Sequence, residues 1–142
     1  MDKVLKELKW VETPYGFSEA IVYDNYTISK DLPKKGDILV NINGDDIFCD
    51  TVEEAIQVIK DAIFDELTYN FDKLNEKYDE IYDFKIQIYN DDFYIVDENE
   101  YFYYDKPFFD DSFEEVRKVI KDILGKNYDI ECECPGRWVI FK

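Results

Sequence analysis

The fold is decided by residues 51–82, which read TVEEAIQVIKDAIFDELTYNFDKLNEKYDEIY. Apolar residues recur there at spacings of three or four, the period of a helix that buries one side. Thr51 and Glu54 form a capping box, in which the hydroxyl and the carboxylate satisfy backbone N–H groups that have no partner within the helix. The segment therefore predicts one long amphipathic helix to about Tyr82, and Asn70, on the apolar side, is the expected break if two helices form instead.

Short strands are predicted on the N-terminal side of this helix. Residues 17–23 and 26–29 are apolar-rich runs separated by the turn dipeptide Asp24-Asn25. Residues 38–42 alternate between apolar and polar, and they end at Asn43-Gly44, a dipeptide typical of a two-residue hairpin. This region is therefore expected to form antiparallel hairpins.

On the C-terminal side, the sequence predicts a meander, a second capped helix and a last hairpin. Ser112 and Glu115 form another capping box, and the helix that follows is expected to run through Leu124 and stop at Gly125. The expected strands are residues 84–89, 93–97 and 101–104 in the meander and 128–134 and 137–141 in the C-terminal hairpin.

The two halves of the chain resemble each other. Aligning residues 48–63 with 109–124 gives eight identities in 16 positions. We therefore predict an α+β fold built from two antiparallel hairpin-then-helix units, with internal duplication as the hypothesis and chance likeness of two capped helices as the alternative. The expected organisation is a single domain over residues 1–142, with pseudo-repeats at 17–83 and 84–142.

Charge is the most distinctive bulk property of the chain. Its 142 residues hold 34 acidic and 17 basic side chains, a net charge of −17, while aromatic residues make up 18%. The aromatic content indicates a folded domain, because disordered acidic segments are poor in aromatics. The charge disfavours direct binding to nucleic acid or to a membrane and favours a basic protein partner. With no long apolar run and no leader, we expect a cytoplasmic protein.

The sequence offers few groups for catalysis. Histidine is absent, and the five glycines are scattered rather than gathered in a phosphate-binding loop. Cys49, Cys132 and Cys134 are an odd number of thiols, and the last two are spaced more tightly than the usual zinc pair. We therefore expect no enzyme activity, no metal and no cofactor, with a carboxylate-dependent or metal-dependent enzyme as the remaining alternative.

The densest acidic patch is expected within residues 91–115, which carry ten acids and one base. Tyrosines lie among these acids, and tyrosine is enriched at the energetic centres of protein interfaces. The alternative is that these tyrosines simply cover a half-buried sheet. The predicted partner-binding residues are Asp91, Asp92, Asp97, Glu98, Glu100, Tyr101, Tyr103, Asp105, Asp110 and Asp111.

A second set of acids follows one side of the long helix. At 100° per residue its members fall within a narrow arc opposite the apolar side, over about 44 Å if the helix is continuous. Solubility alone also explains an acidic side on an amphipathic helix. This secondary acidic stripe consists of Glu54, Asp61, Asp65, Asp72, Glu76, Asp79 and Asp83.

These features favour a non-enzymatic inhibitor that covers a basic, nucleic-acid-binding surface of another protein. In size, charge and aromatic content the chain resembles the nucleic-acid mimics that phages use against CRISPR or restriction systems, and equally the immunity proteins that neutralise nuclease toxins. No motif supports either resemblance. The alternative from another class is a homodimeric adaptor that associates through the long helix.

Overall fold

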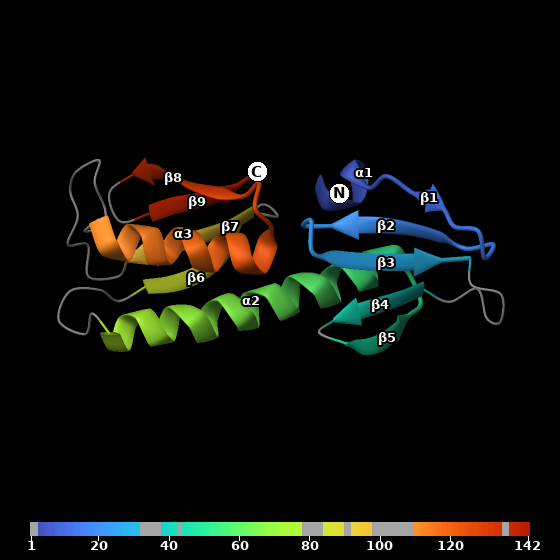
Figure 1. Cartoon of the computed structure of the whole chain (residues 1–142), viewed down its shortest axis with the longest axis horizontal. Helices are drawn as coiled ribbons and strands as arrows, with labels where there is room; N and C mark the ends of the chain where they lie inside the picture. Colours follow the sequence, from blue (N-terminus) through green and yellow to red (C-terminus); the bar gives the residue numbers. More distant parts are fainter. Residues whose placement is uncertain are drawn as a thin grey trace. The chain divides into compact units, whose positions relative to one another are not determined.

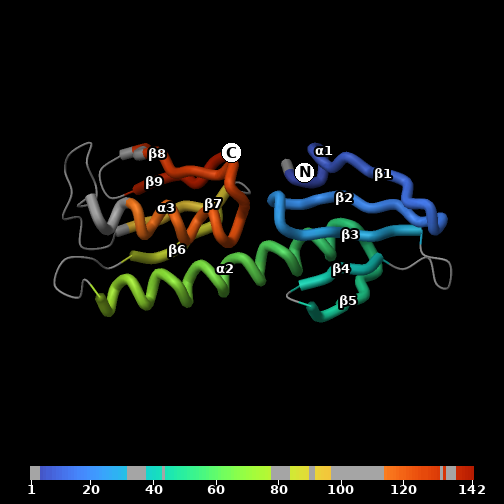
Figure 2. The backbone as a smooth tube through the Cα atoms, in the orientation of Figure 1, coloured from blue at the N-terminus to red at the C-terminus, as the bar shows by residue number. Residues whose placement is uncertain are grey.

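The computed structural model confirms a mixed α+β fold with antiparallel sheets (Figure 1). The chain divides into two compact units, Met1–Ala62 and Ile63–Lys142. The helix α2 (Val52–Lys77) begins in the first unit and ends in the second. The residues that the structure describes are 3–31, 38–42, 44–77, 84–89, 92–97, 110–134 and 137–142. Figure 2 follows the backbone from the N-terminus in blue to the C-terminus in red.

The first unit contains a five-stranded antiparallel meander in the order β1-β2-β3-β4-β5. Its short N-terminal helix α1 was not predicted from the sequence. The elements are α1 (Lys3–Glu7), β1 (Val11–Glu12), β2 (Ser18–Val22), β3 (Tyr26–Lys30), β4 (Ile38–Ile42), β5 (Asp45–Cys49) and the start of α2.

One face of this sheet forms the core of the first unit. Ala20 pairs with Ile28, and Ile28 pairs with Val40, so these three buried side chains lie side by side across neighbouring strands. Ile56 and Ile59 of α2 are also fully buried. Burial of such side chains contributes most of the stability of a domain of this size.

The turn between β4 and β5 is the predicted two-residue hairpin. Ile42 pairs with Asp45, which leaves residues 43–44 as the connection. Gly44 has a φ of 88°, a conformation that costs glycine nothing and strains other residues. The loop length fixes the register that places Ile47 opposite Val40.

The predicted capping box opens α2. The backbone N–H of Glu54 donates to Thr51 Oγ1 at 3.1 Å, and the Glu54 carboxylate accepts from the N–H of Asp50 at 3.2 Å. The helix is unbroken at Asn70, whose side-chain amide donates to the carbonyl of Glu66 at 2.8 Å. Its described part runs to Lys77, and the predicted end near residue 82 lies outside the described residues.

The second unit pairs its strands in the order β6-β7-β9-β8. The predicted C-terminal hairpin is present and lies beside β7, where Trp138 pairs with Ile95. The predicted strand 101–104 lies outside the described residues. The remaining elements are β6 (Phe84–Tyr89), β7 (Asp92–Asp97), α3 (Asp110–Leu124), β8 (Asp129–Cys134) and β9 (Arg137–Phe141).

The core of the second unit lies on the inner face of this sheet. Trp138 and Ile95 are fully buried there, and Phe71 of α2 meets Phe84 of β6 edge to face at 5.8 Å between ring centroids. Asn75 fixes the start of β6, because its side chain both donates to and accepts from the backbone of Phe84, at 3.0 and 2.8 Å. These two hydrogen bonds connect the C-terminal part of α2 to β6.

The helix α3 differs from the prediction at its start. It begins at Asp110, so Ser112 lies within the helix instead of capping it. Glu115, the expected partner of Ser112, instead forms an ion pair with Lys77 of α2. The predicted stop is confirmed, since Gly125 follows the last helical residue with a φ of 138°. The single-domain organisation and the internal duplication stay predictions.

Candidate protein-binding surface

The structure describes four residues of the acidic patch predicted within 91–115. Asp92 and Asp97 are the first and last residues of β7, so the strand rise separates them by about 17 Å. Asp110 and Asp111 belong to α3. The others, which lie outside the described residues, are Asp91, Glu98, Glu100, Tyr101, Tyr103 and Asp105.

The acidic stripe of α2 is better defined. Its five described members are all exposed. Glu54 and Asp61 belong to the part of α2 in the first unit, and the other three belong to the part in the second. Asp79 and Asp83 lie outside the described residues. The exposed members are Glu54, Asp61, Asp65, Asp72 and Glu76.

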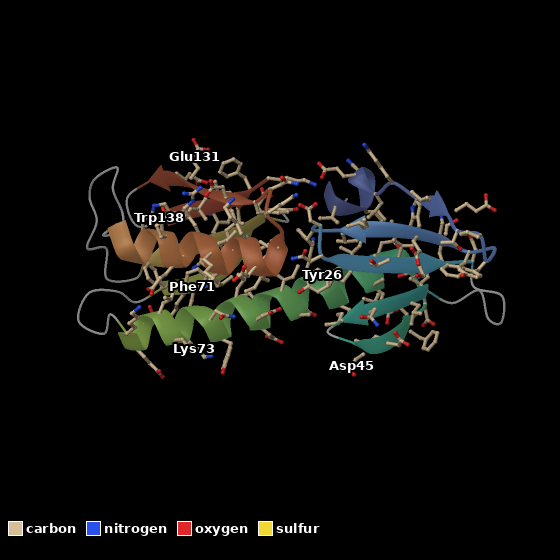
Figure 3. The ribbon with its side chains drawn as sticks, in the orientation of Figure 1. Tyr26, Asp45, Phe71, Lys73, Glu131 and Trp138 are labelled. Atoms are coloured by element: carbon tan, nitrogen blue, oxygen red, sulfur yellow. The ribbon has the colours of Figure 1, made fainter. Side chains whose placement is uncertain are left out.

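Within the second unit, α2 has two sharply different sides. Leu67, Phe71 and Leu74 are buried, whereas the three carboxylates that lie one or two residues away from them are exposed. Figure 3 shows Phe71 and Lys73 on opposite sides of the helix. The amphipathic pattern therefore turns the carboxylates outward, as the sequence predicts.

An exposed tyrosine lies in the middle of these carboxylates. Tyr69 follows Asp65 by four residues and precedes Asp72 by three, so helical geometry places all three on one side. Its side chain is 61% exposed, and the Lys73 ammonium lies 4.3 Å from its ring centroid. We name Asp65, Tyr69, Asp72 and Glu76 the α2 acidic face. Tyr69 is not among the residues predicted from the sequence, although its spacing from the acids places it on the same side of the helix.

Two described lysines of the second unit interact with other parts of the chain. Lys77 pairs with Glu115, and Lys121 donates to the carbonyls of Lys126 and Tyr128, at 3.1 and 2.8 Å. Among the residues that the structure describes, no Lys or Arg lies within ion-pair distance of Asp65, Asp72 or Glu76. The three carboxylates of the α2 acidic face therefore outnumber Lys73, the cation that lies over the Tyr69 ring.

The carboxylate of Asp129 shows what a structural acid in this chain looks like. Arg117 of α3 donates to both oxygens of Asp129, from Nε and from the terminal nitrogen, each at 3.1 Å. Partial burial raises the pKa of Asp129, but hydrogen bonds from the backbone of Ile130 and from Arg117 outweigh it, so the pKa lies below its ordinary value. This pair ties α3 to β8.

The outer face of the second sheet holds a cation between aromatic rings. The Arg137 guanidinium lies 4.3 Å from the Tyr94 ring centroid and 5.7 Å from that of Tyr89. Tyr94 is buried although its register places it on the face opposite Ile95. Sequence alone does not reveal this arrangement, because it depends on the pairing of β7 with β9.

The described carboxylates and the Cys49 thiol are the groups relevant to metal binding and to thiol chemistry. No group of three or more His, Cys, Asp or Glu residues within the described ranges is arranged to hold a metal ion. Burial raises the pKa of the Cys49 thiol, and the Glu54 and Asp50 carboxylates raise it further, so this cysteine is a poor nucleophile. The side chains of Cys132 and Cys134 are outside the description.

Comparisons with known proteins give no family for this chain: no family model, curated protein or solved structure matches it. Over the ranges that the structure describes, every helix is too short or too polar to cross a bilayer.

Proposed function

We propose that this chain is a non-enzymatic binding protein that covers a basic, nucleic-acid-binding surface of a partner protein and thereby blocks it. The observation that supports this most directly is the α2 acidic face, whose three carboxylates are exposed and have no cation at ion-pair distance among the described residues. A surface with this charge attracts the Lys and Arg side chains that hold phosphates in the partner.

Competition for those cations is the proposed mechanism. Asp65 and Glu76 are separated by about 16 Å along the helix axis at 1.5 Å per residue. Three carboxylates over that length are sparser than the phosphates of one DNA strand, which repeat about every 3.4 Å. The α2 acidic face therefore matches only some of the partner's phosphate contacts, and the predicted patch within 91–115 would supply others.

Tyr69 provides the apolar contact that charge alone does not. Exposed tyrosines are favourable interface anchors, because a large rigid ring is buried at the cost of few rotamers. The ring already attracts the Lys73 ammonium, so it is suited to receive a Lys or Arg of the partner in the same way. Carboxylates around it would steer that cation.

The homodimeric alternative gains no support from the described residues. The apolar side of α2, which would form the dimer contact, is buried from Ile56 to Leu74. Because the apolar side of α2 is buried, a partner protein can reach only the exposed acidic side of this helix. The net charge of −17 also opposes close approach of two copies.

A capture experiment tests this function. The chain is immobilised, incubated with a lysate of the source cells, and washed with or without excess duplex DNA. We expect nucleic-acid-binding proteins to be retained and DNA to displace them. Retention should be lost in the triple variant Asp65→Asn, Asp72→Asn, Glu76→Gln.

The matched control removes three charges from another surface of the chain. Glu7, Glu12 and Asp31 are exposed, and the variant Glu7→Gln, Glu12→Gln, Asp31→Asn has the same net charge as the triple variant. It should retain the partner. Equal loss in both variants would show that only net charge matters, and capture that DNA leaves unchanged would contradict the competition mechanism.

A further inference from the structure

The strand β5 lies at the edge of the first unit's sheet. It pairs with β4 along its whole length, from Ile38 opposite Cys49 to Ile42 opposite Asp45. In the described part of the chain no strand pairs with its other side, where Figure 3 shows Asp45 projecting outward. Such an edge presents backbone N–H and C=O groups that can hydrogen-bond to another strand.

Two exposed side chains of β5 are apolar. Phe48 is 62% exposed and Ile47 is 37% exposed. Because they are consecutive, they project toward opposite faces of the sheet, and the Phe48 side lies next to Leu39 of β4. Exposed apolar side chains on an unpaired edge strand can be buried by an added strand. Ile47 and Phe48 would therefore be favourable contacts for it.

Carboxylates surround this apolar centre and determine what can bind it. Residues 45–59 contain five acids and no base. Asp45 and Asp46 precede Ile47, while Asp50 and two glutamates of the first helical turn follow Phe48; all five are exposed. A second copy of β5 would bring two such sets of carboxylates together, which destabilises a strand pair. An extended segment with Lys or Arg side chains would instead be attracted.

We propose that β5 is a docking edge for an extended, Lys- or Arg-containing segment of a partner protein. The segment would add a strand to the sheet by backbone hydrogen bonds. Apolar side chains of the segment would contact Ile47 and Phe48, and its cations would lie beside Asp45, Asp46 and Asp50. This surface lies within the first unit and does not depend on the α2 acidic face.

Two defined peptides test the proposal with the unmodified chain. One is a synthetic peptide of alternating lysine and valine, and the other is the same peptide with alternate backbone nitrogens methylated. Both have the same charge, but the methylated peptide cannot form a strand ladder. We expect the methylated peptide to bind at least about ten-fold more weakly by fluorescence anisotropy, a factor that corresponds to about 1.4 kcal/mol. Equal affinities would overturn the proposal.

Hydrogen exchange locates the binding site. We expect the unmethylated peptide to slow amide exchange in Asp45–Cys49, and protection confined to other strands would contradict the docking edge. Phe48→Ser should weaken binding several-fold. The matched control Ile21→Ser removes an exposed apolar side chain, 66% accessible, from β2 rather than from the edge, and it should bind normally.

The outcomes separate this proposal from the proposed function. If neither peptide binds while partner capture still requires Asp65, Asp72 and Glu76, the docking edge is wrong and the function stands. If the unmethylated peptide binds to β5 but no nucleic-acid-binding partner is captured, the docking edge stands and the function is wrong.

Discussion

The two sides of α2 in the second unit differ in what they do for the molecule. Leu67, Phe71 and Leu74 are buried and pack in the core, whereas Asp65 and Glu76 face solvent. Asp129 of the same unit has a structural role, because Arg117 donates to both of its carboxylate oxygens. The comparison separates carboxylates that hold elements of the fold together from exposed carboxylates of α2 that make no such contact among the described residues.

The largest expected effect comes from the buried side. Phe71→Ala removes a ring that is 1% exposed and in edge-to-face contact with Phe84. The lost burial and the cavity should lower the free energy of unfolding by about 3–5 kcal/mol, measured by urea denaturation. Tyr69→Ala, two residues away on the exposed side, is the matched control and should cost less than about 1 kcal/mol. Similar losses in both would contradict the assignment of the two sides.

A smaller loss is expected when the structural carboxylate is neutralised. Asp129→Asn should lower the free energy of unfolding by about 1 kcal/mol at neutral pH, because the partly exposed pair with Arg117 becomes a weaker hydrogen bond. Urea is the suitable denaturant, since guanidinium salt screens ion pairs.

The pH dependence of this loss follows from the lowered pKa of Asp129. A group whose pKa is lower in the folded state stabilises that state above its unfolded pKa, and this contribution disappears as pH falls through the folded value. The difference between the variant and the unmodified chain should therefore be complete above about pH 5 and vanish in stronger acid. A difference that stays constant down to acid would contradict the role of the Arg117–Asp129 pair.

The smallest expected effect has the opposite sign. Asp72 and Glu76 are four residues apart on the exposed side of α2, and like charges at this spacing repel. Glu76→Gln should therefore raise the free energy of unfolding by about 0.3 kcal/mol in low salt. High salt should abolish the gain, which urea denaturation at two ionic strengths measures. A clear loss of stability would show that Glu76 has a structural role.

Local patterns made most of the fold predictable. The capping box at Thr51 and the turn at Gly44 are signals within a few residues, and the structure has both. The start of α3 was placed too late, because the box at Ser112 resembles a cap whereas the helix begins at Asp110. The predicted end of α2 near residue 82 stays a prediction, because residues 78–83 lie outside the described residues.

The binding surface was predictable only in part. Helical periodicity alone indicated that Asp65 and Asp72 share an exposed side. The pairing of Arg117 with Asp129 and the position of Arg137 against Tyr94 depend on which strands become neighbours. Strand order is a tertiary property that no local pattern in the chain specifies.

The most direct test of the central claim is the salt dependence of partner affinity. For the captured nucleic-acid-binding protein, the dissociation constant is measured between low and physiological salt with the unmodified chain, the triple variant and the matched control. If the α2 acidic face binds the partner's cations, the triple variant should lose at least about ten-fold in affinity at low salt, and its affinity should depend less on salt. The control should remain close to the unmodified chain. Identical affinities and salt dependences for the triple variant and the control would show that the acids of α2 contribute to solubility and not to partner binding.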